Sequence, residues 1–194
     1  VIEPNKNCCN KCRKEFPEMP LVRYATGGYI CASPFPYDGI FRRAVLNFKF
    51  HNCGAYAELL SHEMVRSIKD VYRDRKFDLV TCVPMHKDTL RERGYNQAEL
   101  LAKECARLLG IEYADLLAKT KKNKTQHSIK AAERAKNVIG VYSPIDKNLI
   151  KGKRILIIDD IITTGSTLGE CARILNKCKC GEICCCTLCT SLLI

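Results

Sequence analysis

The sequence has no tryptophan, only three methionines and only seven prolines among its 194 residues. Its longest apolar run, Ile155 to Ile158, ends at two aspartates and is far shorter than the roughly 18 residues that span a bilayer. Residues 1–6 contain no apolar signal core, so nothing indicates secretion. We therefore expect a cytoplasmic protein without a membrane span. The chain begins at Val1 rather than Met, as a piece of a longer chain would.

Acidic residues are also scarce, with 21 Asp and Glu against 32 Lys and Arg, which gives a formal net charge of +11. This balance favours polyanionic partners, a class that includes nucleic acids, nucleotides and phosphorylated sugars. A hydrophobic content of 46% and a charged content of 27% exclude wholesale disorder. The length suits one α/β domain of roughly 150–200 residues with a small N-terminal appendage.

The 14 cysteines are spread through segments with helix and strand patterns, as at Cys82, Cys105 and Cys171. We interpret most of them as free thiols of an apolar core in a reducing compartment, and not as a disulfide scaffold. Alternatively, a soft metal binds the cysteines near the C-terminus. These are Cys178, Cys180, Cys184, Cys185, Cys186 and Cys189.

Short apolar segments alternate with amphipathic ones along most of the chain. Apolar periodicity predicts helices over 39–50, 56–72, 96–109 and 165–176. Strands are predicted over 29–37, 78–83, 111–118, 153–158 and 183–193. Uniformly apolar strands that alternate with helices indicate an α/β fold with a mostly parallel sheet and helices on both faces. We divide the chain into an N-terminal segment, 1–28, and a larger domain, 29–194.

The segment 154–168, R-I-L-I-I-D-D-I-I-T-T-G-S-T-L, is the most informative part of the sequence. An apolar strand delivers Asp159 and Asp160 to its carboxyl end, where ligands bind in open parallel sheets. The following T-T-G-S-T loop opens a helix, whose free N–H groups and positive dipole end suit a phosphate. The two carboxylates can accept hydrogen bonds from sugar hydroxyls or hold a hydrated Mg²⁺.

The Walker A pattern is absent, so we predict a site for a phosphorylated sugar. The alternative is structural: the hydroxyls only cap a helix and the acids only end a strand. Four hydroxyl side chains and two consecutive acids exceed what a simple cap requires.

This segment resembles the signature of type I phosphoribosyltransferases that binds 5-phosphoribosyl-1-pyrophosphate (PRPP). The resemblance implies the type I phosphoribosyltransferase fold, with Mg²⁺ bound together with PRPP. It also implies that Asp159 and Asp160 contact the ribose hydroxyls. The 5′-phosphate would then be bound by Thr163, Thr164, Gly165, Ser166 and Thr167.

Further blocks are similar to the ComF-like family of this superfamily, over about residues 29 to 192. They are F-K-F at 48–50, C-V-P-M-H at 82–86, R-E-R-G-Y-N-Q-A at 91–98, and Gln126, Arg134, Asn137 and Val138. The family is associated with DNA uptake or handling in competence, and the reaction of its phosphoribosyltransferase domain is generally unassigned. The expected partners are thus PRPP or another phosphorylated ribose, together with single-stranded DNA or DNA-uptake proteins.

The R-E-R-G-Y-N-Q-A block follows the end of a predicted strand, at the same sheet edge as the diacid. Arg91 and Arg93 are therefore expected to place their guanidinium groups near a pyrophosphate. Gly94 would permit a tight turn, and Asn96 would cap the next helix. The alternative is that both arginines are solvated surface charges.

The stretch 119–136 carries six Lys and one Arg against one Glu. One interpretation is a loop that closes over pyrophosphate and excludes water. Another is a surface that follows a nucleic-acid backbone, and a third is simply a basic exposed helix.

Cys9-x-x-Cys12 is half of a zinc ribbon, and the ComF-like family usually carries a four-thiolate ribbon ahead of its main domain. Tetrahedral Zn²⁺ needs four ligands. The candidates are Cys9, Cys12 and Cys31, with Cys8 or Cys53 as a fourth. Alternatively, residues 1–28 are a remnant of the ribbon that binds no metal.

Two functions remain open from the sequence. In the first, the protein transfers a phosphoribosyl group to an unknown acceptor and releases pyrophosphate. In the second, it is a non-catalytic accessory protein for DNA handling that retains the architecture of a PRPP site.

Overall fold

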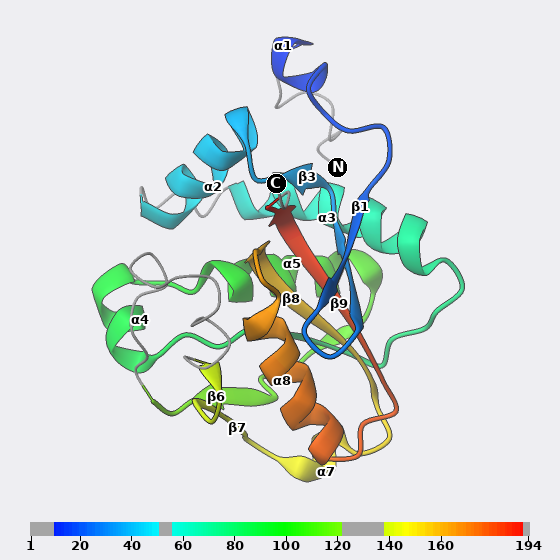
Figure 1. Ribbon diagram of the computed structural model, residues 1–194, viewed down its shortest axis with the longest axis vertical. Helices are drawn as coiled ribbons and strands as arrows, with labels where there is room; N and C mark the ends of the chain where they lie inside the picture. Colours follow the sequence, from blue (N-terminus) through cyan, green and yellow to red (C-terminus); the bar gives the residue numbers. More distant parts are fainter. Residues whose placement is uncertain (1–9, 51–55, 122–137, 192–194) are drawn as a thin grey trace.

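The computed structural model describes residues 10–50, 56–121 and 138–191, and Figure 1 shows the arrangement of their helices and strands. The N-terminal half contains α1 (Asn10–Arg13), β1 (Leu21–Ala25), β2 (Tyr29–Ser33), β3 (Phe35–Pro36), α2 (Gly39–Phe50), α3 (Tyr56–Tyr72), β4 (Leu79–Cys82) and α4 (Lys87–Arg93). The rest contains α5 (Gln97–Leu109), β5 (Glu112–Tyr113), β6 (Leu117–Lys119), β7 (Tyr142–Pro144), α7 (Lys147–Ile150), β8 (Arg154–Ile162), α8 (Ser166–Lys177) and β9 (Glu182–Thr190). No helix among the described residues has the length and apolar character to cross a membrane.

The main sheet has the strand order β1-β2-β9-β8-β4-β5, and β3 also pairs with β9. All of its pairings are parallel except β1 with β2, while β6 and β7 form a separate antiparallel pair. The mostly parallel sheet confirms the predicted α/β class. The central strands β8 and β9 stay in register from Arg154 opposite Glu182 to Ile162 opposite Thr190.

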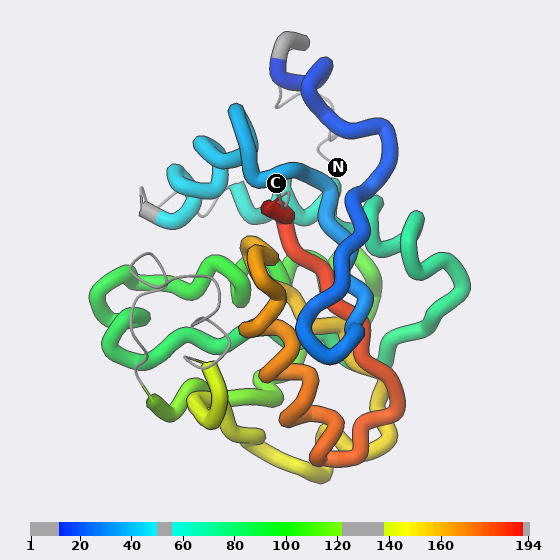
Figure 2. Tube along the Cα trace, viewed as in Figure 1, coloured from blue at the N-terminus to red at the C-terminus, as the bar shows by residue number. Residues whose placement is uncertain are grey.

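Helices cover both faces of the sheet, because alternate residues of β8 enter two different cores. Leu156 and Ile158 pack in one core with residues of α3 and α5. Ile155 and Ile157 pack in the other with residues of α8. Figure 2 shows α8 in front of the strands, with α3 and α5 behind them.

Most predicted elements are confirmed, and the differences follow from pairing between distant segments. The helices predicted over 39–50 and 56–72 match α2 and α3. The strand predicted over 153–158 continues to Ile162, because its ladder with β9 runs past the two acids. The segment 111–118 holds not one strand but β5 and most of β6, which lie in different sheets.

The N-terminal segment contributes directly to the main sheet. β1 pairs with β2 from Leu21 opposite Ser33 to Ala25 opposite Tyr29, so the expected domain boundary after residue 28 falls inside a hairpin. Upstream of β1, the ring of Phe16 lies 4.9 Å from that of Phe35 and 5.6 Å from that of Phe41. Residues 16–28 therefore pack as part of the α/β domain.

The described cysteines are free thiols, and most of them are buried. Cys82, Cys105 and Cys171 lie in the core, as the sequence predicts. Cys184, Cys185, Cys186 and Cys189 are buried on β9, and no group of three metal-ligating side chains exists in the part of the chain that the structure describes. The four cysteines of β9 therefore act as small apolar residues, whereas Cys180 is partly exposed and its Sγ donates to Asn176 Oδ1 at 3.1 Å.

An ion pair joins the amino ends of β4 and β8. Arg154 Nε and Nη2 donate to the two carboxylate oxygens of Asp78 at 3.0 and 2.6 Å, and the Arg154 backbone N–H donates to the same group at 2.8 Å. These hydrogen bonds hold the pKa of Asp78 below its usual range. The pair therefore stabilises the register of the two strands only while Asp78 is ionised.

Replacing Asp78→Asn should lower the melting temperature (Tm) at pH 7 and flatten its decline in acid. A lowered pKa stabilises the fold above the ordinary carboxyl pKa, and this stabilisation is lost as pH falls through the folded-state value. Calorimetric scans from about pH 2 to pH 7 measure the effect. Asp70→Asn, an exposed change on α3, is the control, and parallel curves for Asp78→Asn and the wild type would contradict this role.

Candidate functional site at the carboxyl edge of the sheet

A cavity of about 400 Å³ lies where β4 and β8 end. Its wall includes Asp159, Asp160 and all of the segment 163–168, which is the loop after β8 and the first residues of α8. The segment 83–86 after β4 lies on the wall as well, and the backbone N–H of Val83 donates to the Ile158 carbonyl at 2.9 Å. The sheet edge that the sequence predicted for ligand binding is thus open and polar.

The two acids lie next to each other on β8 and face different partners. Asp159 Oδ1 accepts a hydrogen bond from the backbone N–H of Asp160 at 2.9 Å. Asp160 Oδ2 lies 2.8 Å from the Nζ atom of Lys49, at the end of α2. The pair offers carboxylate oxygens, the donors that Mg²⁺ prefers, in a number that suits a hydrated ion bound together with a phosphorylated substrate.

Burial and the neighbouring carboxylate both act on the pKa of Asp159. Burial of the carboxyl group, with the adjacent charge of Asp160, raises the pKa of Asp159 to about 8. Lys49 and Lys119 oppose this rise. Ionisation of Asp159 is therefore less favourable in this site than in water.

The loop between β8 and α8 forms a cradle at the N-terminus of a 12-residue helix. Gly165 is in the left-handed region with φ of 74°, a conformation that favours glycine. Thr164 Oγ1 lies 2.9 Å from Ser166 Oγ, so these two hydroxyls order each other. The first N–H groups of a helix lack partners within it and suit a phosphate.

The β1–β2 turn supports this cradle from behind. The Thr26 backbone N–H donates to the Gly165 carbonyl at 3.2 Å. A Cβ atom at Gly165 would lie 2.6 Å from Ala25 Cα, and one at Gly169 would lie 2.3 Å from the Thr26 carbonyl oxygen. Glycine is therefore needed at both positions so that the backbone of the β1–β2 turn can approach closely. No local pattern in the sequence indicates this contact.

The R-E-R-G-Y-N-Q-A block forms α4, a turn and the start of α5. As predicted, Asn96 caps α5: its Oδ1 accepts from the Ala98 N–H at 3.1 Å, while its Nδ2 donates to the Val83 carbonyl at 3.1 Å. Gly94 ends α4 in the left-handed region. Arg93 lines the cavity and donates to Gln97 Oε1 at 2.8 Å. Arg91 is exposed and does not line the cavity, so the structure brings only one of the two arginines to the site.

Two lysines that the sequence analysis did not assign as site residues line the cavity. Lys49 comes from the F-K-F element, for which the family resemblance was the only signal. Lys119, on β6, lies 5.6 Å from the ring centre of Tyr142, and burial lowers its pKa. Lys119 is the first residue of the basic stretch 119–136, of which residues 122–137 lie outside the described part of the chain.

The zinc hypothesis remains a prediction. Cys8, Cys9 and Cys53 lie outside the described residues, and Cys12 on α1 is partly exposed. Cys31 is fully buried on β2, its Sγ atom lies 3.7 Å from Thr187 Oγ1, and burial raises the pKa of its thiol to about 12. Its surroundings are those of a protonated core cysteine, which does not suit a zinc thiolate.

Comparison with known proteins supports the superfamily indicated by the site. Residues 96–192 match the family model described as "Phosphoribosyl transferase domain". The chain is 30% identical over 180 residues to "Competence protein F" of Haemophilus influenzae, covering 90% of this chain and 75% of the relative. It is 30% identical over 101 residues to "DNA utilization protein YhgH" of Escherichia coli, covering 52% of this chain and 44% of the relative.

One similar solved structure is the Bacillus subtilis glutamine phosphoribosylpyrophosphate (PRPP) amidotransferase complexed with ADP and GMP. It covers 73% of this chain and 30% of its own, with 17% identity and a TM-score of 0.49.

Gly165→Ala should destabilise the fold more than Gly110→Ala, a matched change at φ of 68° with nothing within 4 Å of the added Cβ. The control should lose about 1–2 kcal/mol from the left-handed conformation alone. Gly165→Ala should lose about 1–3 kcal/mol more, because the Cβ meets the backbone of Ala25. Urea unfolding measures the loss of unfolding free energy in both variants. Equal losses would show that close contact with the β1–β2 hairpin does not require glycine at position 165.

Asp159→Asn should raise the Tm, and by more at pH 8 than at pH 5. A carboxyl group with a pKa of about 8 keeps a proton in the folded state that the unfolded chain has lost, so folding weakens as pH rises between the two values. Asparagine has no such proton. Thermal scans at both pH values test this, with Asp70→Asn as the control, and an equal gain at the two values would argue against the raised pKa.

Proposed function

This chain belongs to the ComF-like family of the type I phosphoribosyltransferase superfamily, and from this premise we propose that its cavity binds PRPP. The observation that carries the proposal is the shared wall of the diacid and the cradle. Asp159, Asp160 and the segment 163–168 line one cavity. A phosphorylated ribose needs both parts at once, since its hydroxyl groups donate to carboxylates and its phosphate binds a helix N-terminus.

The charges around the cavity suit the rest of the PRPP molecule. Arg93, Lys119 and Lys49 place three cationic side chains on the wall, against the two acids. An anion can therefore enter beside the diacid without meeting net negative charge. His86 and Met85, after β4, line the same cavity where a pyrophosphate group would extend away from the ribose.

In the transfer reaction that we propose, a nucleophile on the acceptor attacks the anomeric carbon while the bond from that carbon to the pyrophosphate oxygen breaks. The bonding electron pair leaves with pyrophosphate. Bound Mg²⁺ would neutralise part of the charge on that leaving group. Arg93 and Lys119 would stabilise the departing oxygens, and Asp159 and Asp160 would orient the sugar. The acceptor supplies the nucleophile.

A second function, DNA handling without turnover, is favoured by the names of the relatives. One is a competence protein and the other a DNA utilization protein. The formal charge of +11 also suits a polyanion of many phosphates. In this case the cavity would serve as a regulatory or relic site beside a DNA-binding surface.

Calorimetric titration with PRPP and Mg²⁺ tests the first function. The wild-type protein should bind, and the double variant Asp159→Asn/Asp160→Asn should lose about a hundredfold in affinity, since two hydrogen bonds to charged groups are weakened. The control Asp70→Asn/Asp74→Asn also removes two acidic charges, but from the exposed surface around α3, and should bind PRPP as the wild type does.

The second function is tested by titrating the same proteins with single-stranded DNA at several salt concentrations. Binding that falls steeply with salt and is unchanged in Asp159→Asn/Asp160→Asn would favour the accessory role. An absence of PRPP binding by the wild type would contradict the first function outright.

A further inference from the structure

Lys49 and Asp160 form an ion pair inside the cavity wall. Their Nζ and Oδ2 atoms are 2.8 Å apart, and their side chains are only 20% and 16% exposed. At this exposure, water and salt screen the pair much less than they screen a surface pair. Burial by itself lowers the pKa of Lys49, but the Asp160 and Asp159 carboxylates outweigh it and leave the pKa raised.

Two hydrogen bonds place Lys49 at this position. The hydroxyl of Tyr95 donates to the carbonyl of Phe48, and Gln97 Nε2 donates to the carbonyl of Lys49 at 3.3 Å. The last carbonyls of a helix have no partners within it, so these contacts satisfy the end of α2. Gln97 is 1% exposed and Phe48 is fully buried, so the connection is held firmly in the core.

The R-E-R-G-Y-N-Q-A block therefore reaches the diacid in two ways. Arg93 lines the cavity directly, whereas Tyr95 and Gln97 act through the end of α2. Asn96 caps the start of α5, whereas Tyr95 and Gln97 bind carbonyls at the end of α2. Their common effect is to deliver one ammonium group to one carboxylate.

A diacid without a cation presents a difficulty for an anionic ligand. Two adjacent carboxylates accept sugar hydroxyls well but repel the phosphate attached to the same sugar. A metal ion at the carboxylates is one solution. The ammonium of Lys49, already 2.8 Å from Asp160, is a second solution built from the chain itself.

We propose that Lys49 is the resident counter-ion and positioning residue of the diacid, and that it allows a phosphorylated ribose to bind with no metal ion at the carboxylates. The inference rests on the proposed function. It concerns only the ribose end of PRPP, and Mg²⁺ carried by the pyrophosphate is compatible with it.

Ribose 5-phosphate is the sharpest probe, because it has the ring hydroxyls and the phosphate but no pyrophosphate to bring in a metal. The wild-type protein should bind it equally well, within about twofold, in EDTA and in millimolar Mg²⁺. Lys49→Met should lose about tenfold or more in EDTA and regain most of the loss in Mg²⁺, as the metal replaces the missing charge. Lys49→Arg keeps the charge and should restore binding in EDTA to within about threefold.

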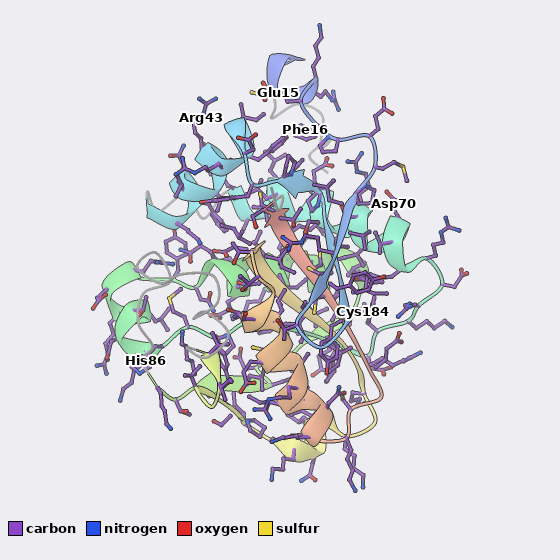
Figure 3. The ribbon with its side chains drawn as sticks, in the orientation of Figure 1. Glu15, Phe16, Arg43, Asp70, His86 and Cys184 are labelled. Carbon is purple, nitrogen blue, oxygen red and sulfur yellow. The ribbon has the colours of Figure 1, made fainter. Side chains whose placement is uncertain are left out.

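Arg43→Met is the matched control for lost charge. Arg43 lies on the same helix, is exposed, and does not line the cavity; Figure 3 shows it on the outer side of α2. Its removal should leave binding unchanged in both buffers, which separates the local role of Lys49 from the general effect of net charge.

Tyr95→Phe tests the delivery of Lys49 while keeping the lysine. It removes the hydroxyl that binds the Phe48 carbonyl and leaves the ring. It should weaken binding in EDTA by less than Lys49→Met does, with the same recovery in Mg²⁺. In the double variant Lys49→Met/Tyr95→Phe the two losses of affinity should not add, because both substitutions act through the same ammonium group.

Four outcomes would overturn the proposal. If Lys49→Met binds ribose 5-phosphate in EDTA as Arg43→Met does, Lys49 has no such role, although the proposed function would stand. If Lys49→Met is weakened equally with and without Mg²⁺, and Lys49→Arg does not restore binding, the lysine acts only on structure. If the wild type binds neither ribose 5-phosphate nor PRPP, the proposed function fails together with this inference.

Should Lys49→Met fail to fold, Tyr95→Phe carries the same comparison, and a loss of affinity that does not depend on Mg²⁺ would reject the inference.

Discussion

The site depends on the balance of charge between neighbouring carboxylates and the ammonium of Lys49. Asp159 and Asp160 follow each other on one strand, so the covalent chain itself forces two like charges together. Lys49 and Lys119 arrive from segments that are distant in the sequence and oppose the rise in the pKa of Asp159. The fold therefore has to bring α2 and β6 to the end of β8 before the diacid can be accommodated.

The R-E-R-G-Y-N-Q-A block shows how one short segment serves both folding and chemistry. Asn96 ties the start of α5 to the loop after β4, and Gln97 ties it to the end of α2. Arg93 is the only one of its two arginines that lines the cavity. A family pattern of this kind is therefore a mixture of ligand-facing and scaffold residues, and the sequence alone does not separate them.

The diacid and the cradle could be predicted because their residues are contiguous, and apolar periodicity was sufficient for α2, α3 and α5. Lys49 and Lys119 could not be assigned in this way, because each reaches the acids only when its own element, α2 or β6, packs near the end of β8. α4 was also missed, since none of its residues is buried and no apolar period marks it. The contact between the β1–β2 hairpin and the cradle was also missed. The need for glycine at 165 and 169 becomes evident only when Ala25 and Thr26 lie against them in the fold.

That hairpin contact changes how an apparently ordinary surface loop should be regarded. Thr26, Gly27 and Gly28 are exposed, and exposed turns normally tolerate insertions, affinity tags and new chain termini. Here an added residue would shift the Thr26 N–H away from the Gly165 carbonyl and remove the support behind the loop that opens α8. For protein engineering, this turn therefore supports the cavity wall and is a poor place for an insertion, whereas the exposed turn at Gly152 has no residue on that wall.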